Sequence, residues 1–413
     1  MAHPMGSMLR VLAPLALLLL PEAALAQSYE KPPSFNAAQI RGIKRVGTNY
    51  TIQTPVRSDG LLRIYVLTTP YGKLEVEGDE MMRMRQNELY VLAQLEKVSN
   101  SESFGRALAE AGLSPLKFTG NLITNPIGTV QNTFAGVGNF FGRVGSGISN
   151  AGQTQDDAMS GLLGVTDQRR QLAATYGVDP YTDFPPLDAR LTQLSQAAAA
   201  GGLVVTGALM AVPGAAGIIV SNLSTAYKLN DIGIEDLARN YDAAQILDLN
   251  RKRLDDMGVD QDTRERFLKN RNFTPIDAAA LVAALDSMKE VEGRPVFVGR
   301  ASVADGRAIA YVMRRQAELM ADDYRKNHNY VRFVALSNYP FVITRDNRIL
   351  AVLPIDALSW TRETAAGFDG ITAQRKRVAP RARGELRLTG TATVLAKKQL
   401  KAAGWAVLEN QRP

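Results

Sequence analysis

The sequence predicts an α+β fold that is predominantly helical, with an N-terminal β-meander, central glycine-rich apolar helices and a small mixed C-terminal sheet with helices. Apolar residues alternate with polar ones between residues 50 and 77, and they recur every three or four positions in the middle of the chain. After residue 231, segments with the first spacing and segments with the second follow each other. The first spacing indicates strands and the second indicates helices. We expect a signal peptide at 1–26, a small α+β domain at 27–117, a glycine-rich apolar helical region at 118–230, an α+β domain at 231–373, and a basic linker with a strand–helix–strand tail at 374–413.

The N-terminus has the layout of a secretory signal peptide. An apolar run, Val11–Leu20, is followed by Pro21 and by small residues that end at Ala26. This order is typical of exported proteins, and the run is shorter than the ~20 residues that a membrane-spanning helix needs. An uncleaved anchor and a buried N-terminal helix are the alternatives. We expect a mature chain from about Gln27, located in the periplasm or at the outer envelope.

The residues available for chemistry exclude several classes of enzyme. The chain has no cysteine, and its mature part has one histidine, His328. Cysteine nucleophiles, thiolate metal sites and paired zinc-binding histidines are therefore excluded. No nucleophile elbow, phosphate-binding loop or dinucleotide motif is present either. We predict no catalytic, cofactor-binding or metal-binding residue and no cofactor.

Carboxylate pairs remain open, because a glycosidase needs only two acids that the fold brings together. Two adjacent pairs occur in the sequence, Asp156–Asp157 and Asp322–Asp323. Three further acids, Asp179, Asp183 and Asp188, are loosely spaced around a turn, and carboxylates are the kind of oxygen ligand that calcium binds. Their spacing matches no calcium loop, so we favour turn and capping roles for them.

The small α+β domain begins with strand patterns and ends with helical ones. Alternating residues predict three strands between Tyr50 and Glu77, separated by turns at Gly60 and Gly72. Helical spacing then predicts helices over Asp79–Val98 and Ser103–Ala111.

The first apolar stretch follows a strict four-and-three spacing from Ile123 to Ile148. Such a stripe is typical of a helix that packs along another helix. Six glycines interrupt it, and each interior glycine costs about 1 kcal/mol relative to alanine. We therefore expect a partner for this helix, which is the protein interior, a membrane surface, or a second copy of the chain. The contact residues that we predict are Ile127, Phe134, Val137, Phe141 and Val144.

The second apolar stretch has no charged residue between Leu191 and Tyr227. Pro213-Gly214 breaks it into two short arms, because proline interrupts the helical hydrogen-bond ladder. We expect a helical hairpin that is either buried core or inserted into one leaflet of a membrane; a full membrane span is a third alternative. The predicted membrane or partner contacts are Leu203, Val205, Leu209, Pro213 and Ile218.

The C-terminal part alternates helices and strands. We predict one helix over Ile234–Met257, a capped helix after Thr274, a strand over Pro295–Arg300 and a helix over Ile309–Lys326. A hairpin and a final strand–helix–strand are expected to share one sheet. Their segments are Tyr330–Leu336, Phe341–Ile343, Ile349–Ile355, Glu385–Leu388, Thr391–Ala403 and Trp405–Leu408.

Positive charge is concentrated at the C-terminus. Residues 374–413 hold ten basic and two acidic side chains. A local excess of this kind attracts anionic surfaces. We predict contact through Arg375, Lys376, Arg377, Arg381 and Arg383. The alternative is a solvated linker without a partner.

These observations predict an exported cell-envelope protein of structural or interaction type, associated with a membrane through its glycine-rich helices. The expected partners are membrane lipid or another envelope protein, with self-association through the 123–148 helix as a further alternative and no nucleic acid. A carboxylate-dependent hydrolase of an envelope polymer and a toxin-like, membrane-inserting protein are the two alternatives.

Overall fold

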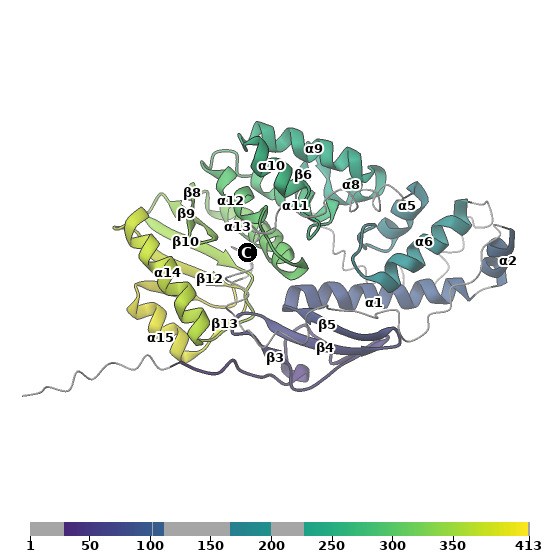
Figure 1. Ribbon diagram of the computed structural model, residues 1–413, viewed down its shortest axis with the longest axis horizontal. Helices are drawn as coiled ribbons and strands as arrows, with labels where there is room; N and C mark the ends of the chain where they lie inside the picture. The colour runs from purple at the N-terminus through teal and green to yellow at the C-terminus, as the bar shows by residue number, and fades with distance from the viewer. Residues whose placement is uncertain (1–28, 101, 111–165, 200–226, 412–413) are drawn as a thin grey trace, which may run out of the picture.

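A computed structural model describes residues 29–100, 102–110, 166–199 and 227–411, and the α+β fold class is confirmed. The described residues form twelve α-helices and several small sheets, arranged in two adjoining units with separate hydrophobic cores (Figure 1). The first unit comprises the N-terminal sheet and the helices up to residue 199. The second unit comprises the remaining helices and the C-terminal sheet.

The N-terminal sheet is antiparallel and contains the three predicted strands. These are β2 (Tyr50–Ile52), β4 (Arg63–Thr69) and β5 (Gly72–Glu77). Two short strands, β1 (Val46–Gly47) and β3 (Arg57–Ser58), extend the sheet in the order β1-β2-β4-β3, and β5 pairs with β4. Alternate residues of β4 are buried, as the period of two predicts.

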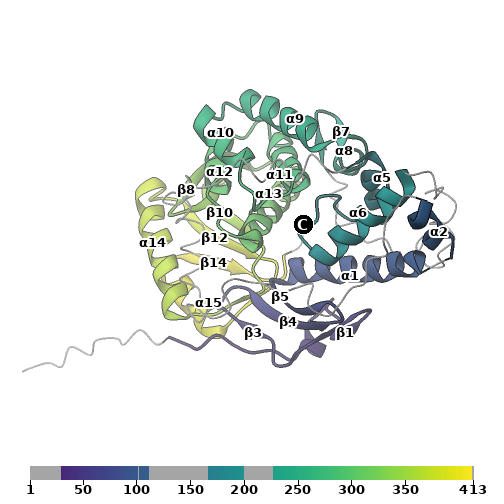
Figure 2. The same cartoon turned by 45° about the vertical axis from the view of Figure 1, so that its right-hand side comes forward.

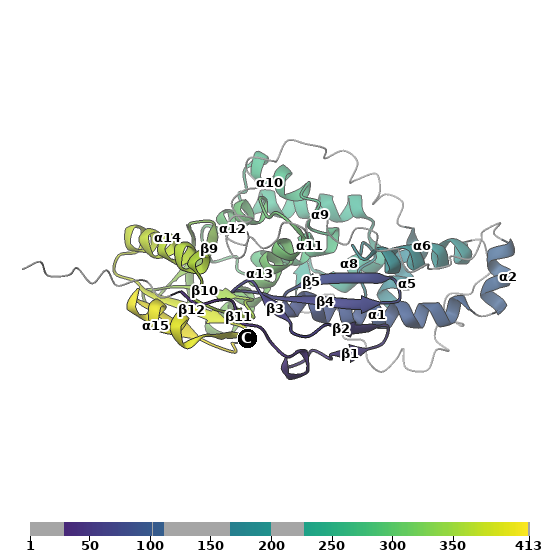
Figure 3. The same cartoon turned by 60° about the horizontal axis from the view of Figure 1, so that its bottom comes forward.

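Helix α1 (Asp79–Ser99) lies along β4 and β5 (Figure 3) and confirms the first predicted helix. Its buried residues include Met82, Leu89, Leu92 and Leu95, all from the predicted apolar stripe. Helix α2 (Glu102–Glu110) follows. Helices α5 (Asp167–Thr175) and α6 (Pro185–Ala199) pack in the same core as α1.

The central helices pack around α11 (Pro275–Asp286), in which every residue is buried. The predicted capping box at its start is confirmed, because Thr274 and Asp277 exchange side-chain-to-backbone hydrogen bonds. The other elements of this region are β6 (Lys228–Leu229), β7 (Ile232–Gly233), α8 (Ile234–Asn240), α9 (Ala243–Asp256), α10 (Gln261–Leu268), α12 (Arg294–Ala301) and α13 (Arg307–Asn327).

Two sequence predictions in this region are wrong. The single helix expected over Ile234–Met257 is divided into α8 and α9, because Asp242 and Gln245 form a capping box that starts a new helix. The strand expected over Pro295–Arg300 is helix α12. A short apolar run does not distinguish a strand from a buried helix, and proline near a helix start favours the helix.

The C-terminal sheet has the order β14-β12-β10-β9-β8, which confirms that the hairpin and the tail share one sheet. Strand β9 (Tyr339–Thr344) pairs antiparallel with β8 (Tyr330–Leu336) on one side and with β10 (Arg348–Leu353) on the other. Strands β12 (Arg383–Leu388) and β14 (Trp405–Leu408) continue from β10 in parallel. Two short strands, β11 (Ala357–Leu358) and β13 (Thr391–Ala392), pair beside this sheet.

Helices α14 (Arg362–Val378) and α15 (Val394–Ala402) connect the parallel strands. They lie on one face of the sheet, and α12 and α13 lie on the opposite face (Figure 1). The expected boundary at residue 373 therefore falls inside α14. Most of the expected linker is the last turn of this helix and a short loop.

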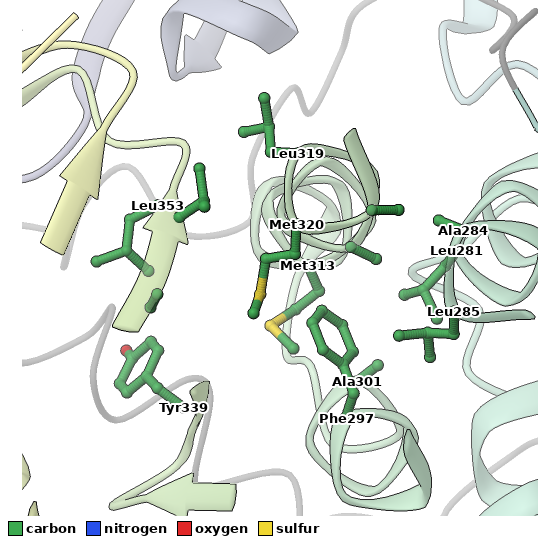
Figure 4. Close-up of a cluster of buried hydrophobic side chains, with 14 of the residues drawn as sticks. Leu281, Ala284, Leu285, Phe297, Ala301, Met313, Leu319, Met320, Tyr339 and Leu353 are labelled. Carbon is green, nitrogen blue, oxygen red and sulfur yellow. The ribbon is translucent and has the colours of Figure 1, made fainter. Parts of the chain in front are cut away.

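Helix α13 occupies the space between α11, α12 and the sheet. Figure 4 shows Met313 and Met320 of α13 between Phe297 of α12 and the strand residues Tyr339 and Leu353. All five side chains are less than 10% exposed. Burial of such side chains contributes about 1.5–3 kcal/mol each, so this layer fixes the sheet against the central helices.

Candidate functional site

The amino ends of the three parallel strands carry a basic surface. Asn347, in the turn before β10, donates its side-chain N–H to the carbonyl of Arg381 at 3.1 Å. The backbone N–H of Arg383 donates to the carbonyl of Asn347, also at 3.1 Å. These contacts hold the turn at residues 345–347 beside the loop at residues 379–383.

Five cations define this basic surface: Arg345, Lys376, Arg377, Arg381 and Arg383. All five are exposed, and within the described ranges none forms a salt bridge. The nearby acids already have arginine partners outside this surface: Asp346 and Glu385 both pair with Arg348 at 2.7 Å, and Glu385 also pairs with Arg387 at 2.6 Å. The edge therefore presents positive charge that the fold itself does not compensate.

Arg375 belongs to the interior and not to this surface, which corrects its predicted place among the surface cations. It is 9% exposed, and its guanidinium donates to the carbonyls of Gly404 at 2.7 Å and Ala403 at 3.1 Å. Its charge also lies 4.9 Å from the ring centre of Trp405. Arg375 thus joins the end of α14 to the start of β14.

The predicted contacts in the two apolar stretches lie outside the described residues. They are Ile127, Phe134, Val137, Phe141, Val144, Leu203, Val205, Leu209, Pro213 and Ile218. In the part of the chain that is described, no helix has both the length and the apolar character needed to cross a bilayer.

A polar cavity of about 400 Å³ lies at the opposite edge of the same sheet, between the two units. The first unit contributes Arg41, Arg63, Asp79 and Arg83 to its wall. The second unit contributes the segments that follow β10, β12 and β14, namely Asp356, residues 389–391 and Asn410. Ligands of α/β sheets bind at this edge, outside the carboxyl ends of the strands.

Asp356 links the two units at the cavity wall. It is 4% exposed, and its Oδ2 accepts the backbone N–H groups of Arg63 at 2.9 Å and Asp79 at 3.0 Å. Burial first, and the charge of Asp79 second, raise the pKa of Asp356 well above its ordinary value, and these effects exceed the opposing effect of the two N–H donors.

Asp79 is held in a different environment, although it lines the same cavity. One carboxylate oxygen accepts from Arg63 at 2.7 Å, and the other accepts from the hydroxyl of Tyr65 at 2.5 Å. The two carboxyl groups that line the cavity thus have different surroundings: Asp356 accepts two backbone N–H groups, and Asp79 accepts from a guanidinium and a phenol.

A second group of charges is enclosed where α1 meets α11 and α13. Arg314 pairs with Asp277 at 2.8 Å and with Glu318 at 3.1 Å, and Arg307 also pairs with Asp277 at 2.6 Å. Arg85 of α1 pairs with Glu88 at 2.6 Å. These ion pairs are buried inside the fold, so we assign them to structure.

The other acids considered from the sequence also have structural partners. Asp179 accepts from Thr274 at 2.6 Å, Asp183 from Arg85 at 3.2 Å and Asp188 from Arg169 at 2.5 Å. Asp322 accepts from Tyr227 at 2.6 Å, and Asp323 accepts from Tyr330 at 2.7 Å. Asp156 and Asp157 lie outside the described residues.

His328 terminates α13, where its φ of 46° places it in the left-handed region, and its ring lies 5.3 Å from that of Tyr324. Among the described side chains, no group of three histidines, cysteines or carboxylates is arranged to hold a metal ion.

Sequence analysis did not identify Asp79 and Asp356 as partners, because 277 positions separate them. Asp79 was visible only as the first residue of a predicted helix. The available signal for Asp356 was its position after the strand at Ile349–Ile355, since acids after parallel strands gather at one edge of a sheet. That signal needs the strand directions, which a hairpin pattern does not supply.

No family model, curated protein or solved structure matches this chain.

Proposed function

We propose that this protein is an exported cell-envelope protein that attaches to anionic lipid headgroups through its basic surface and acts by interaction. The observation that supports the proposal is the gathering of five exposed, unpaired cations on one edge of the C-terminal sheet. The apolar stretches at 123–148 and 197–220 supply a second, membrane-directed contact in this proposal, on the evidence of their sequence.

The rigidity of the surface favours binding over simple solvation. Two of the surface cations lie on α14, two lie on the loop after α14 and the first residue of β12, and Arg345 lies on a turn that is hydrogen-bonded to that loop. The backbone positions of these cations are therefore fixed before binding. Each Lys or Arg near an anionic membrane contributes about 1 kcal/mol at moderate salt, and the attraction falls within a Debye length of about 10 Å at 0.1 M salt.

Vesicle co-sedimentation tests the proposal. The chain from residue 27 to 413 is mixed with vesicles of phosphatidylglycerol or of phosphatidylcholine at several salt concentrations. We expect salt-sensitive binding to the anionic vesicles alone. The variant with Lys376, Arg377, Arg381 and Arg383 all replaced by Gln is expected to bind about two to three orders of magnitude more weakly, at about 1 kcal/mol for each charge.

A matched control separates this surface from net charge. Lys44, Arg45, Lys228 and Lys252 are exposed and lie away from the basic surface, so their replacement by Gln removes the same charge. We expect this control to bind nearly as the wild type does. Equal losses in both variants contradict a specific surface, and unchanged binding of the first variant contradicts any role of these cations.

A second candidate function is a carboxylate-dependent hydrolase of an envelope polymer, and one observation favours it: Asp356 and Asp79 line the same cavity. In such a reaction, the protonated Asp356 would donate its proton to the leaving oxygen, and Asp79 would act as base or nucleophile. Incubation with purified peptidoglycan, followed by detection of new reducing ends, tests this. The Asp79→Asn and Asp356→Asn variants should release none; an inactive wild type removes this candidate.

A further inference from the structure

The cavity between the two units has the size and the setting of a ligand site. Its volume of about 400 Å³ lies within the range of small-molecule sites. Its wall is formed by two separate parts of the chain, and both contribute charged side chains. Hydroxyl and amide groups accompany these charges, including those of Gln39, Thr391 and Asn410.

The charges around the cavity do not cancel. Arg63 is paired with Asp79 at 2.7 Å, and Arg83 is paired with Glu80 at 2.7 Å. Arg41 is exposed, and among the described residues no carboxylate lies within salt-bridge distance of it. Arg41 therefore lines the cavity, and its guanidinium has no counter-charge among the described residues.

Asp356 adds a second hydrogen-bonding group to the cavity wall. Both backbone donors that reach it bind Oδ2, and among the described residues none forms a hydrogen bond with Oδ1. Because burial and Asp79 raise its pKa, this carboxyl can donate a hydrogen bond to a neutral oxygen. An unpaired guanidinium and a carboxyl donor that line the same cavity fit a ligand with an anionic group and a neutral oxygen.

We propose that this cavity binds a sugar-sized, hydroxylated molecule with one anionic group, either a carboxylate or a phosphate. Arg41 binds the anionic group, Asp356 donates to a hydroxyl or ring oxygen, and Thr391 and Asn410 bind further hydroxyls. A guanidinium binds either anion through two parallel N–H groups, so the shared chemistry covers both. The inference uses the cavity of the second candidate function but requires no catalysis.

Isothermal titration of the chain from residue 27 to 413 tests this proposal with three probes of similar size: D-glucuronate, D-glucose 6-phosphate and D-glucose. We expect at least one anion to bind about tenfold or more tightly than glucose, as a charge-assisted hydrogen bond provides. The anion that binds identifies the class of ligand. Equal binding of all three probes, or no binding, overturns the proposal.

Two variants and a control locate the site. Arg41→Gln should abolish the preference for the anion, and Asp356→Ala should weaken all binding that remains, because alanine has no hydrogen-bond donor for the ligand. Arg45→Gln removes a nearby exposed cation that does not line the cavity, and it should change nothing. If Asp356→Ala does not fold, Thr391→Val replaces it, because Thr391 is exposed and lines the cavity. Anion binding that survives Arg41→Gln places the ligand elsewhere and refutes the assignment.

Binding and hydrolysis are separable in this design. An anion that binds at the cavity while peptidoglycan stays intact removes the second candidate function and supports the present inference. Peptidoglycan cleavage without preferential anion binding supports the second candidate function and overturns the present inference.

Discussion

The carboxylate of Asp356 accepts the backbone N–H of Arg63 at 2.9 Å, across 293 positions of the chain. The same oxygen accepts the N–H of Asp79 at 3.0 Å, at the start of α1. Nearby, the backbone N–H groups of residues 356 and 357 donate to the carbonyl of Leu61. One short loop after β10 therefore connects the C-terminal sheet to both the sheet and the first helix of the N-terminal unit (Figure 2).

Asp356→Ala should destabilise the protein by about 2–4 kcal/mol, because two buried N–H groups lose their acceptor at about 1–3 kcal/mol each. Asp356→Asn keeps an acceptor at the same position, so its cost at pH 5 should be below about 1 kcal/mol. Asp369→Ala removes an exposed carboxylate of α14 and serves as a control, with a change within about 0.5 kcal/mol. Urea denaturation measures all three. Equal losses for the Ala and Asn variants would show that these hydrogen bonds contribute little.

The same Asn variant should respond differently to pH. The pKa of Asp356 is higher in the folded state than in the unfolded state, so its stabilising contribution is present at acid pH and is lost as pH rises. Asparagine stays neutral throughout. The stability of Asp356→Asn relative to the wild type should therefore increase between pH 4.5 and pH 8, and a constant difference contradicts a raised pKa.

Glu88 should make the protein less stable as pH rises. Burial raises the pKa of Glu88 to about 7, against the opposing charge of Arg85. Because the folded state holds this proton more tightly, the contribution of Glu88 is present below about pH 4.5, and about 3 kcal/mol of it is lost by pH 7. Glu88→Gln should flatten the dependence of unfolding free energy on pH in this interval. Glu363→Gln, at an exposed position, should leave the slope unchanged.

Arg375 and Arg377 provide a matched pair on one helix. Arg375→Ala should cost about 2–3 kcal/mol, because it removes charge-assisted hydrogen bonds to two carbonyls of the α15–β14 connection. Arg377 is exposed, so Arg377→Ala should change stability by less than about 0.5 kcal/mol while weakening vesicle binding. Chemical denaturation and co-sedimentation together check this. The assignment fails if the two variants lose similar stability.

The sequence predicted those parts of the fold in which local signals and burial agree. The start of α11 follows from Thr274 and Asp277, and the stripe of α1 follows from its apolar spacing. Residues 295–300 were predicted wrongly, because six residues cannot distinguish a strand from a buried helix, and Phe297 is buried in either case. The composition of residues 374–413 showed that this segment is basic. It could not show that Arg375 is buried while the neighbouring cations are exposed, because that difference depends on tertiary contacts.

The cavity was beyond the reach of sequence reasoning for a related reason. Its two carboxyl groups come from units with separate cores, and periodicity gives no information about distances between units. The parallel direction of β10, β12 and β14 decides which loops meet, and that direction follows from the crossover helices α14 and α15. Deleting residues 374–413 is consequently no clean test of the basic tail, because it removes two strands of the sheet.

Gly390 fixes the cavity wall through a close backbone approach. A Cβ at this position would lie 2.0 Å from the carbonyl oxygen of Asp356 and 2.6 Å from that of Ile355, and backbone atoms cannot move aside cheaply. Gly390→Ala should therefore destabilise the protein by about 2–4 kcal/mol, as expected for overpacking combined with a shifted backbone. It should also weaken binding at the cavity, because the loop that holds Asp356 must move.

Gly105→Ala is the matched substitution in open space. Gly105 lies in α2, and nothing within 4 Å would meet its Cβ. Alanine there should stabilise the protein by about 0.5–1 kcal/mol through helix propensity and should leave the cavity unchanged. Thermal denaturation of the two variants distinguishes a steric requirement from a general effect of replacing glycine. If Gly390→Ala is as stable as the wild type, the loop after β12 can relax, and the position of Asp356 does not depend on it.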